Sequence, residues 1–116
     1  MRVLVDGDNV LRALEILRPA EGEQFLQRLE RVAAEKDWDV QVVFDGPERF
    51  LRREQGILKV IYGKGRTADA LIERMAYEAP DRSQVVVVTQ DRAEADLVLG
   101  LGGHVWSPAR LMEEMG

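Results

Sequence analysis

The sequence predicts an α/β domain, a three-layer sandwich in which helices cover both faces of a mainly parallel sheet. Two observations predict it. Short runs rich in Val and Ile alternate along the chain with segments whose apolar residues recur at helical spacing. The runs are mostly apolar, without a strict alternation of polar residues, which is typical of strands buried on both faces of a parallel sheet. A chain of 116 residues fits one domain, and we expect a single domain over residues 1–116.

The first half of the chain alternates between the two kinds of segment. We expect Asn9 to cap the first helix and the stretch from Pro19 to Gly22 to break it. The turn that begins at Asp45 ends a buried strand, because Gly and Pro follow it. In chain order the predicted elements are a strand at 2–5, helices at 10–17 and 23–36, and strands at 40–44 and 57–62.

The second half continues the alternation. Thr67 and Ser107 are each placed to cap a helix, and Pro108 suits the first position of the last one. Four consecutive valines at 85–88 give the strongest strand signal in the chain. The predicted elements are a helix from 67 to about 78, a strand at 85–88, a helix at 93–99, a strand at 104–106 and a final helix after Ser107.

Composition excludes several kinds of site. There is no Cys, so disulfides and Cys-ligated zinc are excluded, and the single His104 rules out a multi-histidine metal site. Any metal must therefore take oxygen ligands, which favours Mg²⁺ or Mn²⁺. The formal net charge of −5 gives no general attraction to nucleic acid. No signal peptide or membrane span is recognisable, so we expect a cytoplasmic protein with no membrane contact.

Five carboxylates fall where a parallel sheet places its ligands, outside the carboxyl ends of the strands. They are predicted to follow strands one, two and four or to begin the helix after strand three, and are Asp6, Asp8, Asp45, Asp69 and Asp91. Gathered in space, these side chains repel one another, and a divalent cation relieves that repulsion. The sequence therefore predicts a metal site at this edge.

A simpler interpretation competes at each position, because Asp is a frequent turn and helix-cap residue. For Asp45, which precedes Gly46 and Pro47, the turn interpretation and the functional interpretation carry equal weight. Asp69 is also favoured in a first helical turn by the helix dipole alone. Co-location favours a functional site for Asp6, Asp69 and Asp91 together. For Asp8 and Asp96 the structural and the functional interpretations carry equal weight. Glu73 is an auxiliary candidate.

With these residues in view, the chain resembles the NYN group of PIN-like nucleases, and within it the YacP-like branch. Two departures stand out: Asp8 occupies a position where an aromatic residue is usual, and Gln90 replaces a small hydroxyl residue. The matching pieces occur in family order and are Val5-Asp6-Gly7-Asp8-Asn9, Val43-Phe44-Asp45, Gly65-Arg66-Thr67-Ala68-Asp69 with Glu73, and Val88-Thr89-Gln90-Asp91.

The resemblance implies a metal-dependent endoribonuclease with the PIN-like fold. It implies metal-binding acids at Asp6, Asp69 and Asp91, with Asn9 hydrogen-bonding inside the site. It implies auxiliary acids at Asp45 and Asp96. A bound Mg²⁺ or Mn²⁺ activates water without a His base, which suits a chain whose one His is far from these acids in sequence.

The predicted RNA contacts are positive side chains near the acids. Lys64 and Arg66 precede the helix of Asp69, and Arg92 follows Asp91. Arg49 and Arg53, with Arg52 between them, form a second candidate rim, for which a solvated polar helix is an equally good interpretation.

Two other functions stay open at this point. The opening Asp6-Gly7-Asp8 also resembles haloacid-dehalogenase-like phosphatases, in which Asp6 would be the nucleophile and Asp8 the acid/base. The third is an inactive domain that binds RNA or a protein. An apolar face near the C-terminus, at Leu111 and Met115, makes a homodimer possible.

Overall fold

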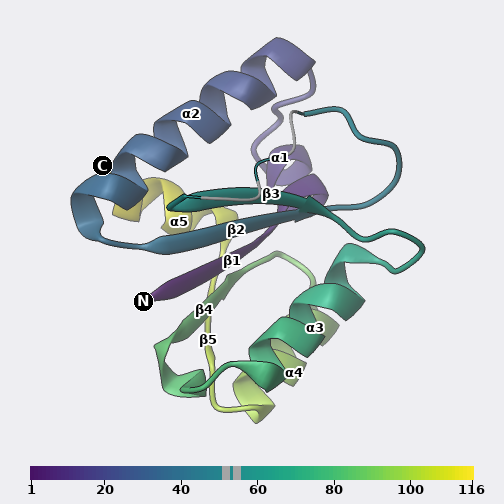
Figure 1. Ribbon diagram of the computed structural model, residues 1–116, viewed down its shortest axis with the longest axis vertical. Coiled ribbons are helices and arrows are strands. Elements are labelled where there is room, and N and C mark those ends of the chain that lie inside the picture. The colour runs from purple at the N-terminus through teal and green to yellow at the C-terminus, as the bar shows by residue number, and fades with distance from the viewer. Residues whose placement is uncertain (51–52, 54–55) are drawn as a thin grey trace.

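The computed structural model describes residues 1–50, 53 and 56–116. Its centre is a five-stranded sheet in the order β3-β2-β1-β4-β5, and every neighbouring pair is parallel. This confirms the predicted α/β class with a parallel sheet (Figure 1). The strands are β1 (Arg2–Asp6), β2 (Asp39–Phe44), β3 (Leu58–Tyr62), β4 (Val85–Val88) and β5 (His104–Trp106).

Helices cover both faces of the sheet (Figure 1). On one face α1, α2 and α5 pack against Val3 and Val5, and on the other α3 and α4 pack against Leu4. Successive residues of a strand point to opposite faces, so β1 contributes to both apolar layers. The helices are α1 (Gly7–Ala13), α2 (Pro19–Lys36), α3 (Ala68–Glu78), α4 (Arg92–Gly100) and α5 (Pro108–Met115), with a short 3₁₀ turn at Arg82–Gln84.

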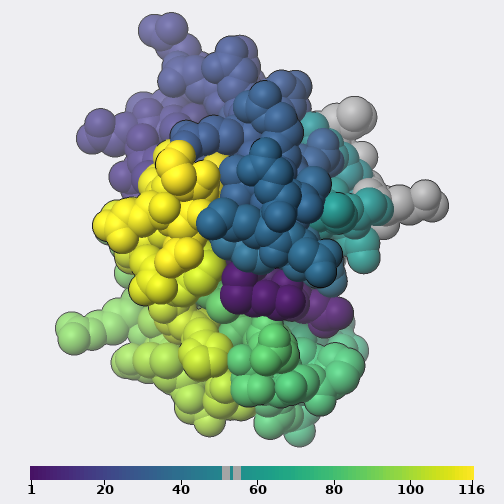
Figure 2. Space-filling model, turned by 90° about the vertical axis from the view of Figure 1, so that its left-hand side faces the viewer, coloured from purple at the N-terminus to yellow at the C-terminus, as the bar shows by residue number. Residues whose placement is uncertain are grey.

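Figure 2 shows the first residues of the chain lying between the two helical layers, and α5 lying against α2. The contact between those helices includes a hydrogen bond of 2.8 Å from the Arg28 guanidinium to the carbonyl of Gly116. Within the described part of the chain, no helix combines the length and the apolar composition that crossing a bilayer requires.

The predicted first helix is wrong at both ends. It begins at Gly7, directly after β1, and ends at Ala13 rather than near Leu17. Asn9 lies inside this helix and does not cap it, because Asp6 occupies the N-cap position. Glu15 has a φ of 59°, a left-handed conformation that the helix cannot continue through.

The second helix starts earlier than predicted. Pro19 is its first residue instead of a breaker, because proline lacks only an N–H that the first turn leaves unpaired anyway. The predicted caps of α3 and α5 are confirmed: Thr67 accepts the N–H of Ala70, and Ser107 that of Arg110.

The described residues of the Arg-rich segment after β2 are not helical, unlike the solvated helix that was one interpretation of this segment. Residues 48–50 are irregular, and Arg53 forms an antiparallel bridge with Val60 of β3. Arg52 lies outside the described residues.

Candidate active site

The parallel sheet brings the ends of β1, β2 and β4 to one edge, and the residues that follow them line a hollow of about 210 Å³. We call it the carboxylate hollow. All five aspartates predicted to meet at this edge line it, as does Asn9. One cation, Arg12, joins them within the described part of the chain. The lining residues are Asp6, Asp8, Asn9, Arg12, Asp45, Asp69 and Asp91.

A close approach of α1 to β2 positions Asp8. Gly7 lies against the ring of Phe44, and a Cβ at Gly7 would come within 2.4 Å of that ring. Only glycine therefore lets α1 start at this point, and the next side chain, Asp8, reaches the end of β2. The Gly7 in the Asp-Gly-Asp opening is thus a packing requirement of the site.

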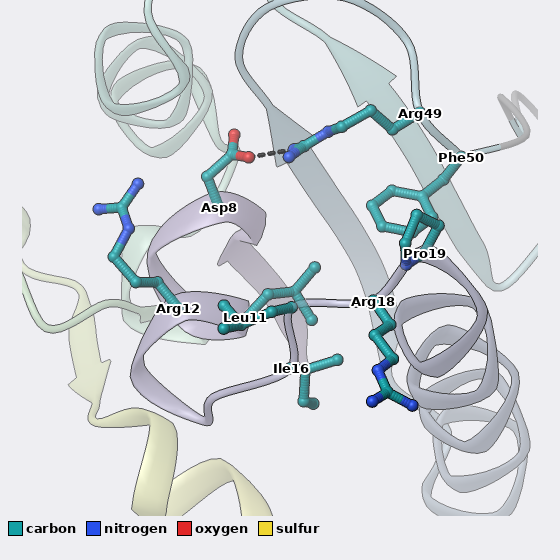
Figure 3. Close-up of a pocket in the computed structure, with 9 residues that line it drawn as sticks. Asp8, Leu11, Arg12, Ile16, Arg18, Pro19, Arg49 and Phe50 are labelled. Atoms are coloured by element: carbon teal, nitrogen blue, oxygen red, sulfur yellow. Dashed lines mark hydrogen bonds and ion pairs between the residues drawn. The ribbon is translucent and has the colours of Figure 1, made fainter.

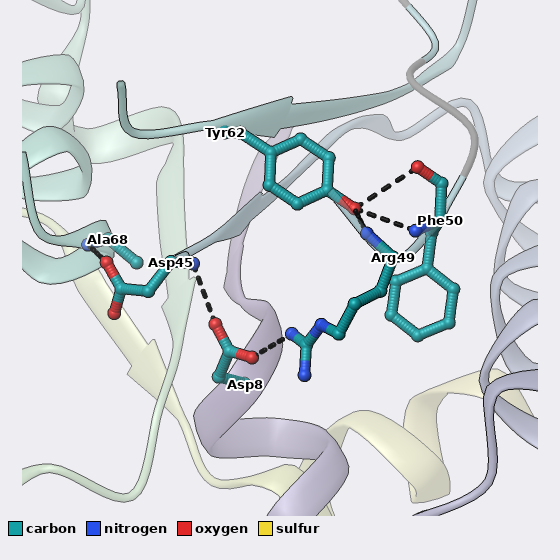
Figure 4. Close-up of polar contacts among 6 residues, drawn as sticks. All are labelled: Asp8, Asp45, Arg49, Phe50, Tyr62 and Ala68. Carbon is teal, nitrogen blue, oxygen red and sulfur yellow. Dashed lines mark hydrogen bonds and ion pairs between the residues drawn. The ribbon is translucent and has the colours of Figure 1, made fainter. Parts of the chain in front are cut away.

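Asp8 and Asp45 link α1 to the end of β2 and the end of β2 to the start of α3 (Figure 4). The carboxylate of Asp8 accepts the backbone N–H of Asp45 at 2.7 Å and pairs with the guanidinium of Arg49. The carboxylate of Asp45 in turn accepts the N–H of Ala68 at 2.6 Å, at the start of α3. This pairing satisfies a free helix N–H and places negative charge at the positive end of the helix dipole. The structural interpretation of Asp45 is therefore supported, and Asp45 also lines the hollow.

Arg49 is held by Tyr62 from β3. The hydroxyl of Tyr62 accepts the backbone N–H groups of Arg49 at 3.0 Å and Phe50 at 2.8 Å, and it donates to the carbonyl of Phe50 at 3.1 Å (Figure 4). The guanidinium of Arg49 also lies over the rings of Phe44 and Phe50. Tyr62 thus fixes the segment that carries the counter-ion of Asp8.

Asn9 ties α1 to the segment after β4. Its side-chain oxygen accepts the backbone N–H of Gln90 at 2.7 Å. Because Gln90 precedes Asp91, this bond fixes the distance between the two strand ends that present Asp6 and Asp91 to the hollow.

Asp91 caps α4, and its neighbours form a small network. Its carboxylate accepts the N–H of Glu94 at 3.0 Å, while its own N–H donates to the hydroxyl of Thr89. That hydroxyl donates to Oε2 of Glu94 at 3.0 Å. The cap leaves Asp91 exposed at the hollow and fixes its orientation.

Glu94 is the buried acid below the hollow, with only 2% of its surface exposed. Its pKa is raised to about 9, first by burial and then by a hydrogen bond to Asp6 and the charge of that group. Oε1 of Glu94 meets no donor among the described residues as long as it is ionised. The raised pKa favours the protonated form of Glu94, whose carboxyl group donates a hydrogen bond to Asp6.

The pKa of Asp6 is also raised. Burial is the largest cause, and the charges of Asp8 and Asp45 add to it, whereas the hydrogen bond from Glu94 and the backbone of Asn9 lower it. Carboxylates that repel one another in a partly buried hollow favour either a proton or a cation.

Glu94 was not among the site residues predicted from the sequence, although its position relative to Asp91 indicated it. It lies three residues after Asp91, the spacing of a helix N-cap and the third helical residue. A carboxylate in the first turn of a helix at this edge of the sheet is a candidate site residue for the same reason as Asp69. Asp96, which was named instead, is exposed on α4 and does not line the hollow, and neither does the half-buried Glu73 on α3.

The predicted RNA-contacting cations lie outside the lining of the hollow. Lys64, Arg66 and Arg92 are exposed at the starts of α3 and α4. Arg49 is paired with Asp8, and Arg53 with Glu23 at 3.4 Å. Arg12, which does line the hollow, was not identified in the sequence because no motif adjoins it.

The oxygen donors of the hollow suit a hard divalent cation such as Mg²⁺ or Mn²⁺. Among the residues that the structure describes, no three acidic or His side chains already converge at the spacing of a bound ion. The donor chemistry therefore suits such an ion, although the side chains are not arranged around one in this structure.

Comparison with known proteins agrees with this fold. The family model of the YacP-like NYN domain matches residues 3–116. Two crystal structures of Rae1 (YacP) from Bacillus subtilis superpose with a TM-score of 0.81 each, covering 99% of this chain. One, of a mutant, is 27% identical over 74% of its chain, and the other is 24% identical over 73%. No curated protein sequence matches this chain. The chain therefore belongs to the YacP-like NYN domain family, which is of nuclease type.

Proposed function

We propose that this protein is a metal-dependent endoribonuclease that hydrolyses RNA phosphodiester bonds in the carboxylate hollow. One observation carries the proposal: five aspartates from four separate segments line a single hollow at the carboxyl edge of the sheet. Membership of a nuclease-type family supports it.

We assign Asp6, Asp69 and Asp91 as the ligands of Mg²⁺ or Mn²⁺. A bound ion of this kind lowers the pKa of water and polarises a phosphoryl oxygen. Asp6 is oriented from below by Glu94, and Asp91 by its capping bond to the N–H of Glu94. Asn9 holds the two strand ends in register through Gln90.

The remaining acids have supporting roles in this proposal. Asp8 and Asp45 hold α1, the end of β2 and the start of α3 together through their hydrogen bonds, and they add negative charge that attracts a cation. Asp96 and Glu73 do not line the hollow, so we assign them no catalytic step.

Backbone phosphates of RNA are expected to meet cations around the hollow. Lys64, Arg66 and Arg92 are exposed and flank the helices that carry Asp69 and Asp91. Arg49 and Arg53 become available only when they leave Asp8 and Glu23. Because the chain is acidic overall, such local contacts have to supply the attraction.

The test is an assay of the purified protein with Mn²⁺ on a fluorescently labelled RNA of defined sequence, with chelator in a parallel reaction. We expect discrete internal cleavage products that the chelator abolishes. An aryl phosphate run alongside tests the phosphatase interpretation, against which the family assignment argues. Phosphate release from that compound with intact RNA would refute the ribonuclease, and intact RNA with intact aryl phosphate would favour an inactive binding domain. The cytoplasmic location and the possible homodimer stay predictions, although Leu111 and Met115, named for an apolar face, are buried in the core.

A further inference from the structure

A second pocket adjoins the carboxylate hollow, between α1 and the start of α2 (Figure 3). We call it the α1–α2 pocket. Its volume is about 150 Å³. It is formed by residues from α1, from the connection to α2, from the start of α2 and from the segment after β2, among them Leu11, Arg12, Ile16, Pro19, Arg49 and Phe50.

The pocket is continuous with the hollow, because Asp8 and Arg12 line both of them. The carboxylate of Asp8 faces the hollow edge and is paired there with Arg49, whose backbone is held by Tyr62. A linear chain that passes through the hollow can therefore continue into the pocket, with Arg12 between the two spaces.

The pocket has an apolar floor and a positively charged rim. Leu11 and Phe50 are 7% and 6% exposed and form the floor together with the half-buried Ile16. At the rim, Arg12 is exposed, and no partner of its side chain is recorded among the described residues. The Arg18 side chain is 85% exposed, and its contact with Glu21 is a long 3.6 Å.

This combination contrasts with the hollow itself. Apart from Arg12 and Asn9, the hollow presents only carboxylates, so by itself it repels a polyanion. The adjoining pocket offers what the hollow lacks: guanidinium groups for phosphate and an apolar surface for the planar base. Its volume is also below the roughly 300–1,000 Å³ of pockets that enclose whole ligands. It therefore suits one unit of a longer chain.

We propose that the α1–α2 pocket binds the nucleotide next to the scissile phosphate of an RNA chain. The base rests on Leu11, Ile16 and Phe50, and the flanking phosphate is bound by Arg12 with support from Arg18. Arg12 is thus a substrate-positioning residue that couples the pocket to the hollow. This inference rests on the proposed ribonuclease function and adds the path of the substrate to it.

The test uses two variants that act on the pocket by different means. Arg12→Gln removes the cation shared by both spaces. Leu17→Glu adds a negative charge at the rim, where the side chain is 77% exposed and the substitution costs little packing. The matched controls are Arg31→Gln, an exposed arginine on α2, and Leu99→Glu, a 55% exposed leucine on α4.

Binding is measured first, by fluorescence anisotropy with a labelled oligoribonucleotide in the presence of chelator, so that no cleavage occurs. We expect both pocket variants to bind at least about fivefold more weakly than the controls, with unchanged melting temperatures. Arg12→Gln should also reduce the slope of log affinity against log salt by about one contact, whereas Arg31→Gln should not.

Location is measured second, by irradiating the wild-type complex with an oligoribonucleotide that carries 4-thiouridine and identifying the crosslinked peptide. We expect the crosslink within residues 11–19 or at Phe50. A crosslink confined to other segments, or pocket variants that bind and cleave RNA as the controls do, would overturn the inference and leave the ribonuclease intact. If the wild type neither binds nor cleaves RNA, the proposed function fails first and the pocket assignment fails with it.

Discussion

The side-chain oxygen of Asn9 accepts the backbone N–H of Gln90 at 2.7 Å, across 81 residues of sequence. This bond joins the helix that follows β1 to the segment that follows β4. Since Asp6 and Asp91 stand on either side of it, Asn9 sets their separation without any need to touch a substrate itself.

Asn9→Ala removes this link and should therefore affect cleavage more than stability. Gln90 is exposed, so water can replace the lost partner, and we expect the free energy of unfolding to fall by about 0.5–1.5 kcal/mol. Mn²⁺ affinity and RNA cleavage should fall together, because the two aspartates are no longer held in register. Unchanged metal affinity in Asn9→Ala would refute the positioning role.

Glu94→Gln should make the protein more stable at high pH. A carboxyl group with a raised pKa keeps its proton in the folded state while the unfolded state loses it, so folding stability falls as pH rises between the two values. For Glu94 that window runs from its ordinary pKa of 4.5 to about 9. Glutamine stays neutral throughout, and its amide can still contact Asp6 and Thr89.

The measurement is the melting temperature of both proteins between about pH 5 and about pH 8. The difference in favour of Glu94→Gln should grow with pH across this range. The raised pKa of Asp6 also makes the folding stability fall as pH rises, and it does so in both proteins. A constant difference at every pH would contradict a neutral, proton-donating Glu94.

Asp69→Asn should abolish RNA cleavage while the fold survives. The amide keeps the size of the side chain and suits the first turn of α3, but it is a weaker metal ligand. We expect a loss of cleavage by orders of magnitude with an unchanged circular dichroism spectrum. Asp37→Asn is the control, because Asn tolerates the left-handed conformation at that position, where φ is 58°. Wild-type cleavage by the Asp69→Asn protein would overturn the site assignment.

Mn²⁺ should raise the melting temperature through the carboxylate hollow. An ion present at a hundred times its Kd stabilises the folded state by about 2.7 kcal/mol. Asp91→Asn, which retains a capping side chain for α4, should lose most of this shift. If the wild type and Asp91→Asn respond equally to millimolar Mn²⁺, the ion binds somewhere else.

Lys64→Asn combined with Arg66→Gln should weaken RNA binding and flatten its salt dependence. Asparagine is chosen because Lys64 has a φ of 37°, which most side chains tolerate poorly. Two lost phosphate contacts should lower the slope of log affinity against log salt by about two. Wild-type affinity and slope in the double variant would show that these residues do not contact phosphate.

Much of the fold was predictable because its strands are short, mostly apolar and separated by clear turn residues. Val85–Val88 and the caps at Thr67 and Ser107 needed no tertiary information. The start of α1 was not predictable in the same way. Asp6 ends β1 and precedes α1 directly, so the usual loop with a capping residue is missing.

The aspartates of the site were predictable because parallel strands end at one edge. What escaped prediction depends on contacts between distant segments. The pKa of Glu94 is raised by its burial and by the neighbouring Asp6. The pairing of Arg49 with Asp8 depends on Tyr62 of β3, which holds the backbone of Arg49. Arg12 reaches the hollow because Gly7 lets α1 lie close to Phe44.

The central position of β1 in the sheet has a consequence for folding during synthesis. During synthesis β1 leaves the ribosome before one of its two neighbours, β4, which is not complete until Val88. Pairings this distant in sequence form slowly, and an apolar strand that waits unpaired is prone to aggregate. We therefore expect a chaperone that shields β1 in the nascent chain to raise the yield of native protein during synthesis.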